Sequence, residues 1–183
     1  METSTIHVLL IDDNPQYVDV VRHFLRPFQG TPFELRSAND PLKGLELIRS
    51  KAPLDLILLD YFLPGTTGVE LAKMLFSEKI GIPIILLTSN RDFRIAIEAM
   101  KYGVGDYLIK EDSVDTVLPR TIINAVDRHR LSLKIAAAEK QKAMAERTAE
   151  TVQELVVTMC HEFNNPLAAI KISADIILRQ QIS

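Results

Sequence analysis

Up to about Lys110, short apolar runs alternate with stretches in which apolar residues recur every third or fourth position. The recurring positions, such as Val18, Val21 and Leu25, form the stripe that a helix turns toward a sheet. The runs are rich in Ile, Leu and Val on both faces, which is typical of parallel strands covered by helices on each side. They predict strands at residues 7–11, 33–38, 54–59, 83–87 and 106–109. The pattern therefore predicts an α/β fold with a doubly wound, five-stranded parallel sheet.

The chain beyond Lys110 has a different character. No glycine occurs from Ser113 to Gln181, and the only prolines there are Pro119 and Pro166, so we expect one long helix. A weak apolar seam recurs along this segment at spacings based on three and four residues, and it favours a dimeric coiled coil. The seam consists of Ala138, Ala145, Thr148, Val152, Leu155 and Met159. A lone solvated helix is the alternative, because alanine and threonine bury little apolar surface.

Composition and charge narrow the range of functions. The 183 residues carry 24 acidic and 21 basic side chains and a net charge of -3, without the clustered Lys and Arg that nucleic-acid backbones require. The start of the chain lacks a signal-peptide pattern, and the longest apolar runs are too short to cross a bilayer. A single cysteine, Cys160, excludes a disulfide framework. We therefore expect a cytoplasmic protein that contacts neither nucleic acid nor the membrane directly.

Polar residues follow four of the predicted strands. Asp12 and Asp13 follow the first strand, Asp60 the third, Thr88 the fourth and Lys110 the fifth. Because the carboxyl ends of parallel strands share one edge of the sheet, we expect these side chains to converge there. Converging carboxylates repel one another unless a raised pKa or a cation relieves the repulsion, and Mg²⁺ is the natural cation for such oxygen ligands. The set suits a phosphoryl group, which the Asp60 carboxylate can accept as a nucleophile.

These residues carry a resemblance to a known family. The ordered set resembles the motifs of response-regulator receiver domains over roughly residues 6–130, and it consists of Asp12-Asp13, Asp60-Tyr61-Phe62-Leu63-Pro64-Gly65-Thr66-Thr67-Gly68, Thr88 and Gly105-Asp106-Tyr107-Leu108-Ile109-Lys110. The resemblance implies a sheet in the strand order 2-1-3-4-5. It also implies that Asp60 is phosphorylated from a phosphohistidine.

The same resemblance implies roles for the other site residues. It places Mg²⁺ on three carboxylates and one main-chain carbonyl, those of Asp12, Asp13, Asp60 and Phe62 respectively. Thr88 and Lys110 would each bind a phosphoryl oxygen, and Tyr107 would turn inward as a switch. Two positions depart from the family pattern: Glu111 stands where proline usually follows the lysine, and Ser89 stands where alanine or glycine usually follows the threonine.

A histidine motif lies within the predicted long helix. The segment His161-Glu162-Phe163-Asn164-Asn165-Pro166-Leu167 resembles the H-box of histidine kinases, in their dimerisation and histidine-phosphotransfer domain. An imidazole on a helix face can accept a phosphoryl group when a carboxylate holds its other nitrogen or takes a proton, and Glu162 is placed for that. The resemblance makes His161 the phosphoacceptor and Asn165 a residue that steers phosphatase chemistry.

The resemblances together predict three segments: a receiver domain at 1–130, a helical coiled-coil linker at 131–155, and the first helix of an incomplete histidine-phosphotransfer domain at 156–183. The second helix of that domain and a glycine-rich ATP-binding lobe are not found in these residues. We therefore expect a fragment of a hybrid receiver–histidine kinase whose parent is an ATP-dependent protein-histidine kinase.

The predicted function is phosphorelay signalling, in which phosphorylation of Asp60 controls the kinase module bearing His161 through a dimeric helical stalk. The expected partners are a second copy of the chain, an upstream phosphohistidine protein and a downstream response regulator. One alternative is a phosphohydrolase that forms an aspartyl phosphate, although such enzymes commonly place a second acid two residues after the nucleophile, where this chain has Phe62. The other alternative is a non-catalytic dimerising scaffold.

Overall fold

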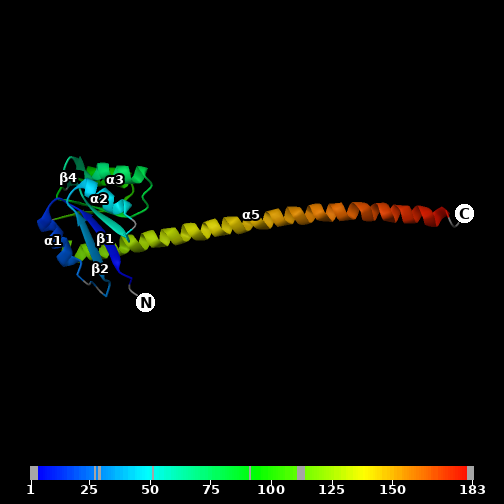
Figure 1. Ribbon diagram of the computed structural model, residues 1–183, viewed down its shortest axis with the longest axis horizontal. Helices are drawn as coiled ribbons and strands as arrows, with labels where there is room; N and C mark the ends of the chain where they lie inside the picture. Colours follow the sequence, from blue (N-terminus) through cyan, green and yellow to red (C-terminus); the bar gives the residue numbers. More distant parts are fainter. Residues whose placement is uncertain are drawn as a thin grey trace. The chain divides into compact units, whose positions relative to one another are not determined.

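A computed structural model describes residues 4–26, 28, 30–50, 52–90, 92–110 and 114–180 (Figure 1). The side chains of residues 93, 114–116 and 161–180 lie outside this description. The chain divides into two compact units, Met1–Leu131 and Ser132–Ser183, which are described separately here.

The first unit is built on one parallel sheet. Its strands are β1 (Ile6–Ile11), β2 (Phe33–Ala38), β3 (Leu56–Asp60), β6 (Ile84–Thr88) and β7 (Val104–Ile109). They lie side by side in the order β2-β1-β3-β6-β7, and every pairing is parallel. This confirms the predicted five-stranded sheet and its order, with strand ends displaced by no more than two residues. A short antiparallel hairpin of β4 (Phe62–Leu63) and β5 (Thr66–Thr67) was not predicted, because two-residue strands show no periodicity.

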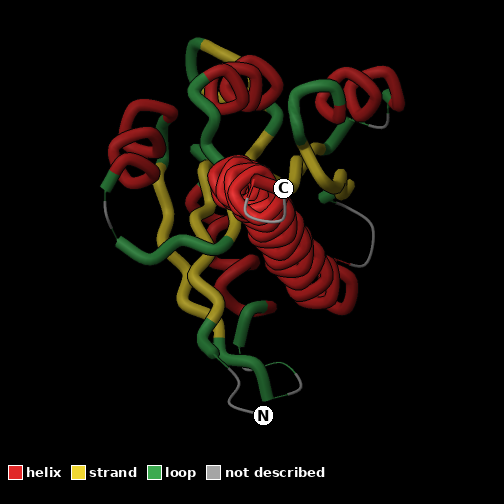
Figure 2. The backbone as a smooth tube through the Cα atoms, turned by 90° about the vertical axis from the view of Figure 1, so that its right-hand side faces the viewer, coloured by secondary structure: helices red, strands yellow, loops and turns green. Residues whose placement is uncertain are grey.

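Helices cover both faces of the sheet (Figure 2). One face packs against α2 (Pro41–Arg49), α3 (Gly68–Ser77) and α4 (Phe93–Met100), and the other packs against α1 (Pro15–Phe24) and the first turns of α5 (Val114–Gln180). Successive residues of β1 alternate between the two cores, since Leu9 and Ile11 join the first and Val8 and Leu10 join the second.

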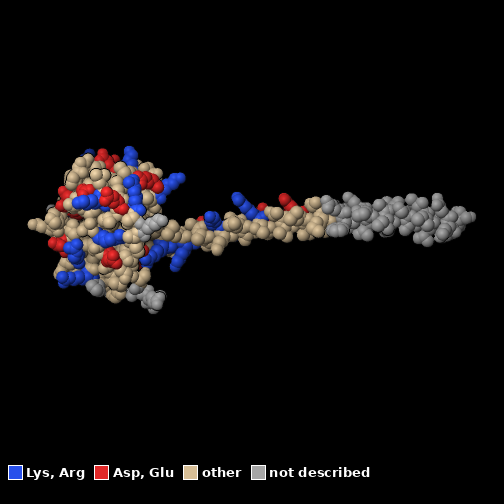
Figure 3. Space-filling model, in the orientation of Figure 1, with Lys and Arg blue, Asp and Glu red and all other residues tan. Residues whose placement is uncertain are grey.

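Burial follows the position of each strand in the sheet. Every residue of the central strands β3 and β6 is buried, as their uninterrupted apolar runs predict. The edge strands β2 and β7 are mostly half-buried, because each has a neighbouring strand on one side only. Acidic and basic side chains are interspersed over the face of this unit seen in Figure 3.

Local capping explains why the helices begin directly after the strand ends. The side chain of Asn14 accepts hydrogen bonds from the main chain of the first turn of α1, and Asp40 does the same for α2. Thr67 and Glu70 form a reciprocal capping box at the start of α3. These caps hold the loops at the carboxyl edge of the sheet in fixed conformations.

The predicted long C-terminal helix is confirmed, since α5 is continuous from Val114 to Gln180. Ser113, its expected N-cap, lies outside the described residues. In the second unit, the described side chains of α5 are exposed, including the large apolar side chains of Val152, Leu155 and Met159. Among the described helices, none has an apolar stretch long enough to cross a membrane.

Candidate functional site

Three carboxylates meet at the carboxyl edge of the sheet. Asp12 and Asp13 directly follow β1, and Asp60 is the last residue of the neighbouring strand β3. Each of these side chains offers an oxygen, and the three oxygens lie within 4.8 Å of one another. Asp12 is 1% exposed and Asp60 is 4% exposed, whereas Asp13 is open to solvent. The site is therefore an acidic pocket with two buried walls and one exposed side.

Lys110 lies among these carboxylates. Its Nζ is 2.8 Å from Oδ2 of Asp12 and 2.9 Å from Oδ1 of Asp60, and its side chain is 13% exposed. The backbone of Lys110 is also held, because its N–H donates to the carbonyl of Thr88 at 2.9 Å. The lysine thus reaches the pocket from the end of β7, two strands away from Asp60 in the sheet.

The environment of Asp60 raises the pKa of its carboxyl above the ordinary value. Burial is the largest cause, and the negative charge of Asp12 adds to it. The ammonium of Lys110 and the main-chain N–H of Phe62 act in the opposite direction. The protonated form of Asp60 is therefore favoured more than usual, and a further cation beside it would favour the ionised form.

The donor set fits a divalent metal ion. Three carboxyl groups lie around a single ammonium, so the cluster can carry more negative charge than Lys110 neutralises. Oxygen ligands of this kind suit Mg²⁺, which takes one or two carboxylates and keeps several waters. Asp12, Asp13 and Asp60 are the side chains that would hold such an ion.

A glycine makes the close approach beside Asp60 possible. The N–H of Gly68 donates to the carbonyl of Tyr61 at 2.8 Å, which brings the start of α3 against the end of β3. A Cβ atom at Gly68 would lie 2.3 Å from the carbonyl oxygen of Asp60 and 2.9 Å from a methyl carbon of Leu86. Only glycine permits this packing without displacing the backbone that carries Asp60.

Thr88 and Tyr107 lie on neighbouring strands at the same edge. Thr88 is fully buried, and its Oγ1 accepts a hydrogen bond from the N–H of Asn90 at 3.0 Å. The half-buried Tyr107 donates its hydroxyl hydrogen to the carbonyl of the same Asn90. Both predicted residues therefore contact the loop that follows β6.

Phe62 is 58% exposed, so its ring lies at the surface beside the acidic pocket. It packs edge-on against the ring of Tyr61, with centroids 4.7 Å apart.

Tyr17 is a site residue that the sequence reasoning missed. It lies in the first turn of α1, and the Nζ of Lys110 is 4.3 Å from the centroid of its ring. The hydroxyl of Tyr17 is buried and has no hydrogen-bond partner among the described residues. The available signal was its spacing of four from Val21, which places Tyr17 on the apolar stripe of α1 that faces the sheet.

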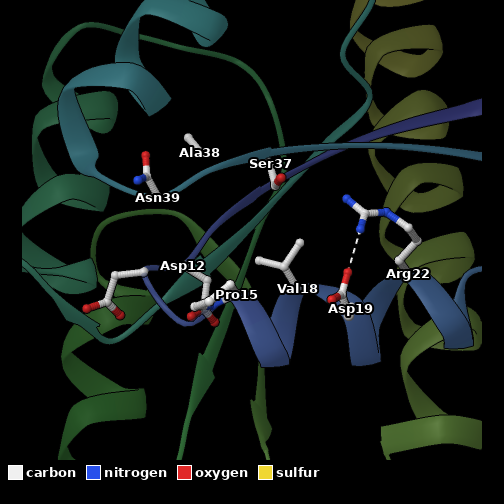
Figure 4. A pocket seen from close by; sticks show the side chains of 9 residues that line it. Asp12, Pro15, Val18, Asp19, Arg22, Ser37, Ala38 and Asn39 are labelled. Carbon is white, nitrogen blue, oxygen red and sulfur yellow. Dashed lines mark hydrogen bonds and ion pairs between the residues drawn. The ribbon is translucent and has the colours of Figure 1, made fainter.

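A pocket of about 340 Å³ opens next to Asp12 and Asp13 (Figure 4). Its walls come from α1 and from the end of β2, and Arg22 pairs with Asp19 across 2.6 Å on the α1 side. Asn39 lies on the opposite wall. The pocket gives solvent and solutes a route to the exposed side of the acidic cluster.

The predicted site residues of the histidine motif lie in α5. The backbone of residues 161–180 is helical, but the side chains of His161, Glu162 and Asn165 lie outside the described residues, as does Glu111. Their predicted roles stay predictions.

Comparison with known proteins finds response regulators and a hybrid histidine kinase among the proteins similar to this chain. The MtrA DNA-binding response regulator of Mycolicibacterium smegmatis is 31% identical over 60% of this chain and 46% of its own length, so this chain spans about half of that relative. Hybrid signal transduction histidine kinase D of Dictyostelium discoideum is 25% identical over 89% of this chain and 12% of its own length. The solved receiver domain of Francisella response regulator 1452 is 26% identical, with a TM-score of 0.58 over 67% of this chain and 98% of that domain.

The family comparison covers most of the sheet-containing unit. Residues 8–121 match the response regulator receiver domain, and they include most of β1, all of β7 and all of the acidic residues of the pocket. Members of this family accept phosphoryl groups on aspartate in two-component systems and generally bind Mg²⁺ in an acidic pocket. With its match over residues 8–121, its parallel sheet and its cluster of carboxylates around a half-buried lysine, this chain belongs to the response regulator receiver domain family.

Proposed function

We propose that Asp60 is the phosphoacceptor of this receiver and that the phosphoryl donor is a phosphohistidine. The observation that carries the proposal is the ion pair between Lys110 and a buried Asp60 inside a cluster of three carboxylates. A carboxylate oxygen of Asp60 attacks phosphorus, and the P–N bond to the donor imidazole breaks. The bonding electrons leave on the imidazole nitrogen, which takes up a proton.

The neighbours of Asp60 have separate roles in this transfer. The Lys110 ammonium lies 2.9 Å from Asp60, where it can follow a phosphoryl oxygen as the negative charge moves onto the transferred group. Asp12, Asp13, Asp60 and the carbonyl of Phe62 would hold Mg²⁺, which neutralises phosphoryl charge when it is bound. The Oγ1 of Thr88 accepts a hydrogen bond from Asn90, and among the described residues no acceptor takes its hydroxyl hydrogen, which could be donated to a phosphoryl oxygen.

The proposal extends to the output of the receiver. Tyr107 and Thr88 both contact Asn90. A movement of Thr88 toward a phosphoryl oxygen would therefore shift Asn90 and change the hydrogen bond that holds the Tyr107 hydroxyl. We infer that this pair couples the phosphorylated pocket to the surface around β7. The change in state would then reach α5, which packs on the sheet through Leu118 and Ile122.

Control of a kinase module bearing His161 is the further part of the proposal. It is supported by the H-box-like sequence in the continuous helix α5 and by the similarity to a hybrid histidine kinase. We propose a receiver at 1–130, a linker at 131–155 and the start of a histidine-phosphotransfer domain at 156–183. An upstream phosphohistidine protein and a downstream response regulator would be the partners.

We also propose that the chain forms a homodimer through α5, along the helical linker and the first residues that follow it. Val152, Leu155 and Met159 recur at spacings of three and four along α5, and their side chains are 53%, 58% and 53% exposed. A second copy of this helix would bury them as a coiled-coil seam.

The dimer can be tested by measuring the molar mass of the full chain by light scattering. Val152→Asp places a charge in the seam and should yield the monomer. The matched variant Thr151→Asp adds the same charge one position away and should remain dimeric. A wild-type chain that is monomeric at 100 μM would refute the dimer.

The receiver function is tested by phosphate incorporation from acetyl phosphate with Mg²⁺, measured by intact-mass spectrometry. Wild type should gain one acid-stable, base-labile phosphoryl group, and Asp60→Asn should gain none. Asp19→Asn is the matched control, because Asp19 is an exposed carboxylate near the same pocket, and it should behave as wild type. Incorporation into Asp60→Asn at the wild-type rate would overturn the assignment.

A further inference from the structure

Lys110 is held in the pocket by three contacts of two kinds. Two are charged, with Nζ at 2.8 Å from Asp12 and 2.9 Å from Asp60. The third is the face of the Tyr17 ring, whose centroid lies 4.3 Å from Nζ. That distance is well within the range in which an ammonium is attracted to the negative face of an aromatic ring, and the attraction grows when the cation is shielded from water. Lys110 is shielded, because its side chain is 13% exposed.

The ring contact differs from the two ion pairs in what phosphorylation does to it. When Asp60 becomes an acyl phosphate, its carboxylate oxygen is covalently used, so Lys110 exchanges one of its two charged partners for a phosphoryl oxygen. A metal ion bound at Asp12 competes for the other partner. The Tyr17 ring is unaffected by either event, and it is therefore the contact that keeps the flexible lysine directed into the pocket throughout the transfer.

The chemistry of Tyr17 is consistent with a neutral aromatic support. Burial, and then the charges of Asp12 and Asp60, raise the pKa of its hydroxyl well above the ordinary value, so the phenol stays protonated. The hydroxyl itself has no partner among the described residues, which makes the ring and not the hydroxyl the part that acts on Lys110. The ring also packs on the core beneath α1, so its position is fixed.

We propose that Tyr17 is a positioning residue of the phosphorylation site, which holds the Lys110 ammonium toward Asp60 through its ring face. This inference rests on the proposed phosphorylation of Asp60. It adds α1 to the elements that build the site, and it gives a role to the aromatic ring at this position.

The test compares Tyr17→Phe, which keeps the ring, with Tyr17→Leu and Tyr17→Met, which do not. Tyr102→Leu is the matched control. The Nζ of Lys73 lies 5.4 Å from the centroid of the Tyr102 ring, and this similar contact is away from the acidic pocket. The rate of phosphorylation by acetyl phosphate is measured at saturating Mg²⁺, together with the apparent affinity for Mg²⁺. We expect about a tenfold lower rate for Tyr17→Leu and Tyr17→Met, with Mg²⁺ affinity changed less than twofold, and wild-type rates for Tyr17→Phe and Tyr102→Leu.

A spectroscopic measurement separates positioning from general packing. With ¹⁵N-labelled lysine, the shielded ammonium of Lys110 should give a resonance displaced by the ring current of Tyr17. The displacement should persist in Tyr17→Phe and vanish in Tyr17→Leu and Tyr17→Met, even if one of these variants is less stable. Wild-type rates in all three variants, or an equal loss in Tyr17→Phe, would overturn the inference. Absence of phosphorylation in the wild type itself would instead refute the proposed function.

Discussion

Removing the charge of Lys110 is the sharpest test of how the acidic pocket is held together. Lys110→Met keeps most of the side-chain volume but leaves Asp12 and Asp60 buried without the ammonium that lies within 2.9 Å of each. Loss of one partner from a buried ion pair costs about 3–5 kcal/mol. With a urea m-value of about 2 kcal/mol/M, the unfolding midpoint should fall by about 2 M in the absence of Mg²⁺.

The pH dependence of this loss has a defined sign. Burial already raises the pKa of Asp60, and removal of Lys110 takes away an opposing influence, so the pKa rises further. A group whose pKa is raised on folding stabilises the folded state below its unfolded pKa, and this stability is lost as the pH rises through the folded pKa. The difference between Lys110→Met and wild type should therefore be largest at neutral pH and shrink as the pH falls.

Tyrosine fluorescence is a suitable probe, because all four tyrosines lie in the unit Met1–Leu131 and the chain has no tryptophan. Mg²⁺ at ten times its dissociation constant should restore about 1.4 kcal/mol to either protein. Lys43→Met is the control, since Lys43 is exposed and pairs only with surface groups. A midpoint for Lys110→Met within 0.3 M of wild type, or a difference that does not change with pH, would refute this account of the pocket.

Three further predictions concern single positions. Gly68→Ala should destabilise the fold by about 1–3 kcal/mol and slow phosphorylation, because the added Cβ meets the backbone at the end of β3. Gly81→Ala should do neither, because no atom lies within 4 Å of the added Cβ. Urea titration measures the stability, and phosphate incorporation measures the rate. Phe62→Ala should shorten the acyl-phosphate lifetime several-fold by admitting water, and equally exposed Phe76→Ala should not; an unchanged lifetime would contradict the shielding role. Asp55→Asn should lower the free energy of unfolding by about 1.5–3 kcal/mol at pH 7, because the carboxylate accepts hydrogen bonds from a backbone N–H and an arginine. Burial raises the pKa of Asp55, but these hydrogen bonds outweigh it and lower the pKa. That deficit should disappear in acid titrations as the pH falls through the lowered pKa, and a deficit that persists there would count against it.

The predicted helical linker should contribute little to the stability of the first unit. Its described side chains are exposed, so substitutions there should leave the urea midpoint of the first unit unchanged. A change in stability caused by Val152→Asp would therefore report association of the helices and not damage to the sheet.

Much of the fold could be predicted because the local signals agree with one another. The uninterrupted apolar runs at β3 and β6 predict strands buried on both faces, and both strands are fully buried. Polar residues placed directly after those strands predict one acidic edge, since parallel strands present their carboxyl ends together. The hairpin after Asp60 escaped this reasoning, because its strands of two residues are too short to show a period.

Sequence alone determined which residues lie at the ends of the strands, because strand direction and apolar periodicity place them there. Which of these residues touch was decided only by tertiary structure. The ring of Tyr17 lies 4.3 Å from the Nζ of Lys110, although the two residues belong to α1 and to the end of β7. Likewise, the need for glycine at position 68 arises from a backbone carbonyl of another element. Periodicity defines the face of an element but not the neighbour across from it, and that neighbour depends on the packing of helices and loops over the whole sheet.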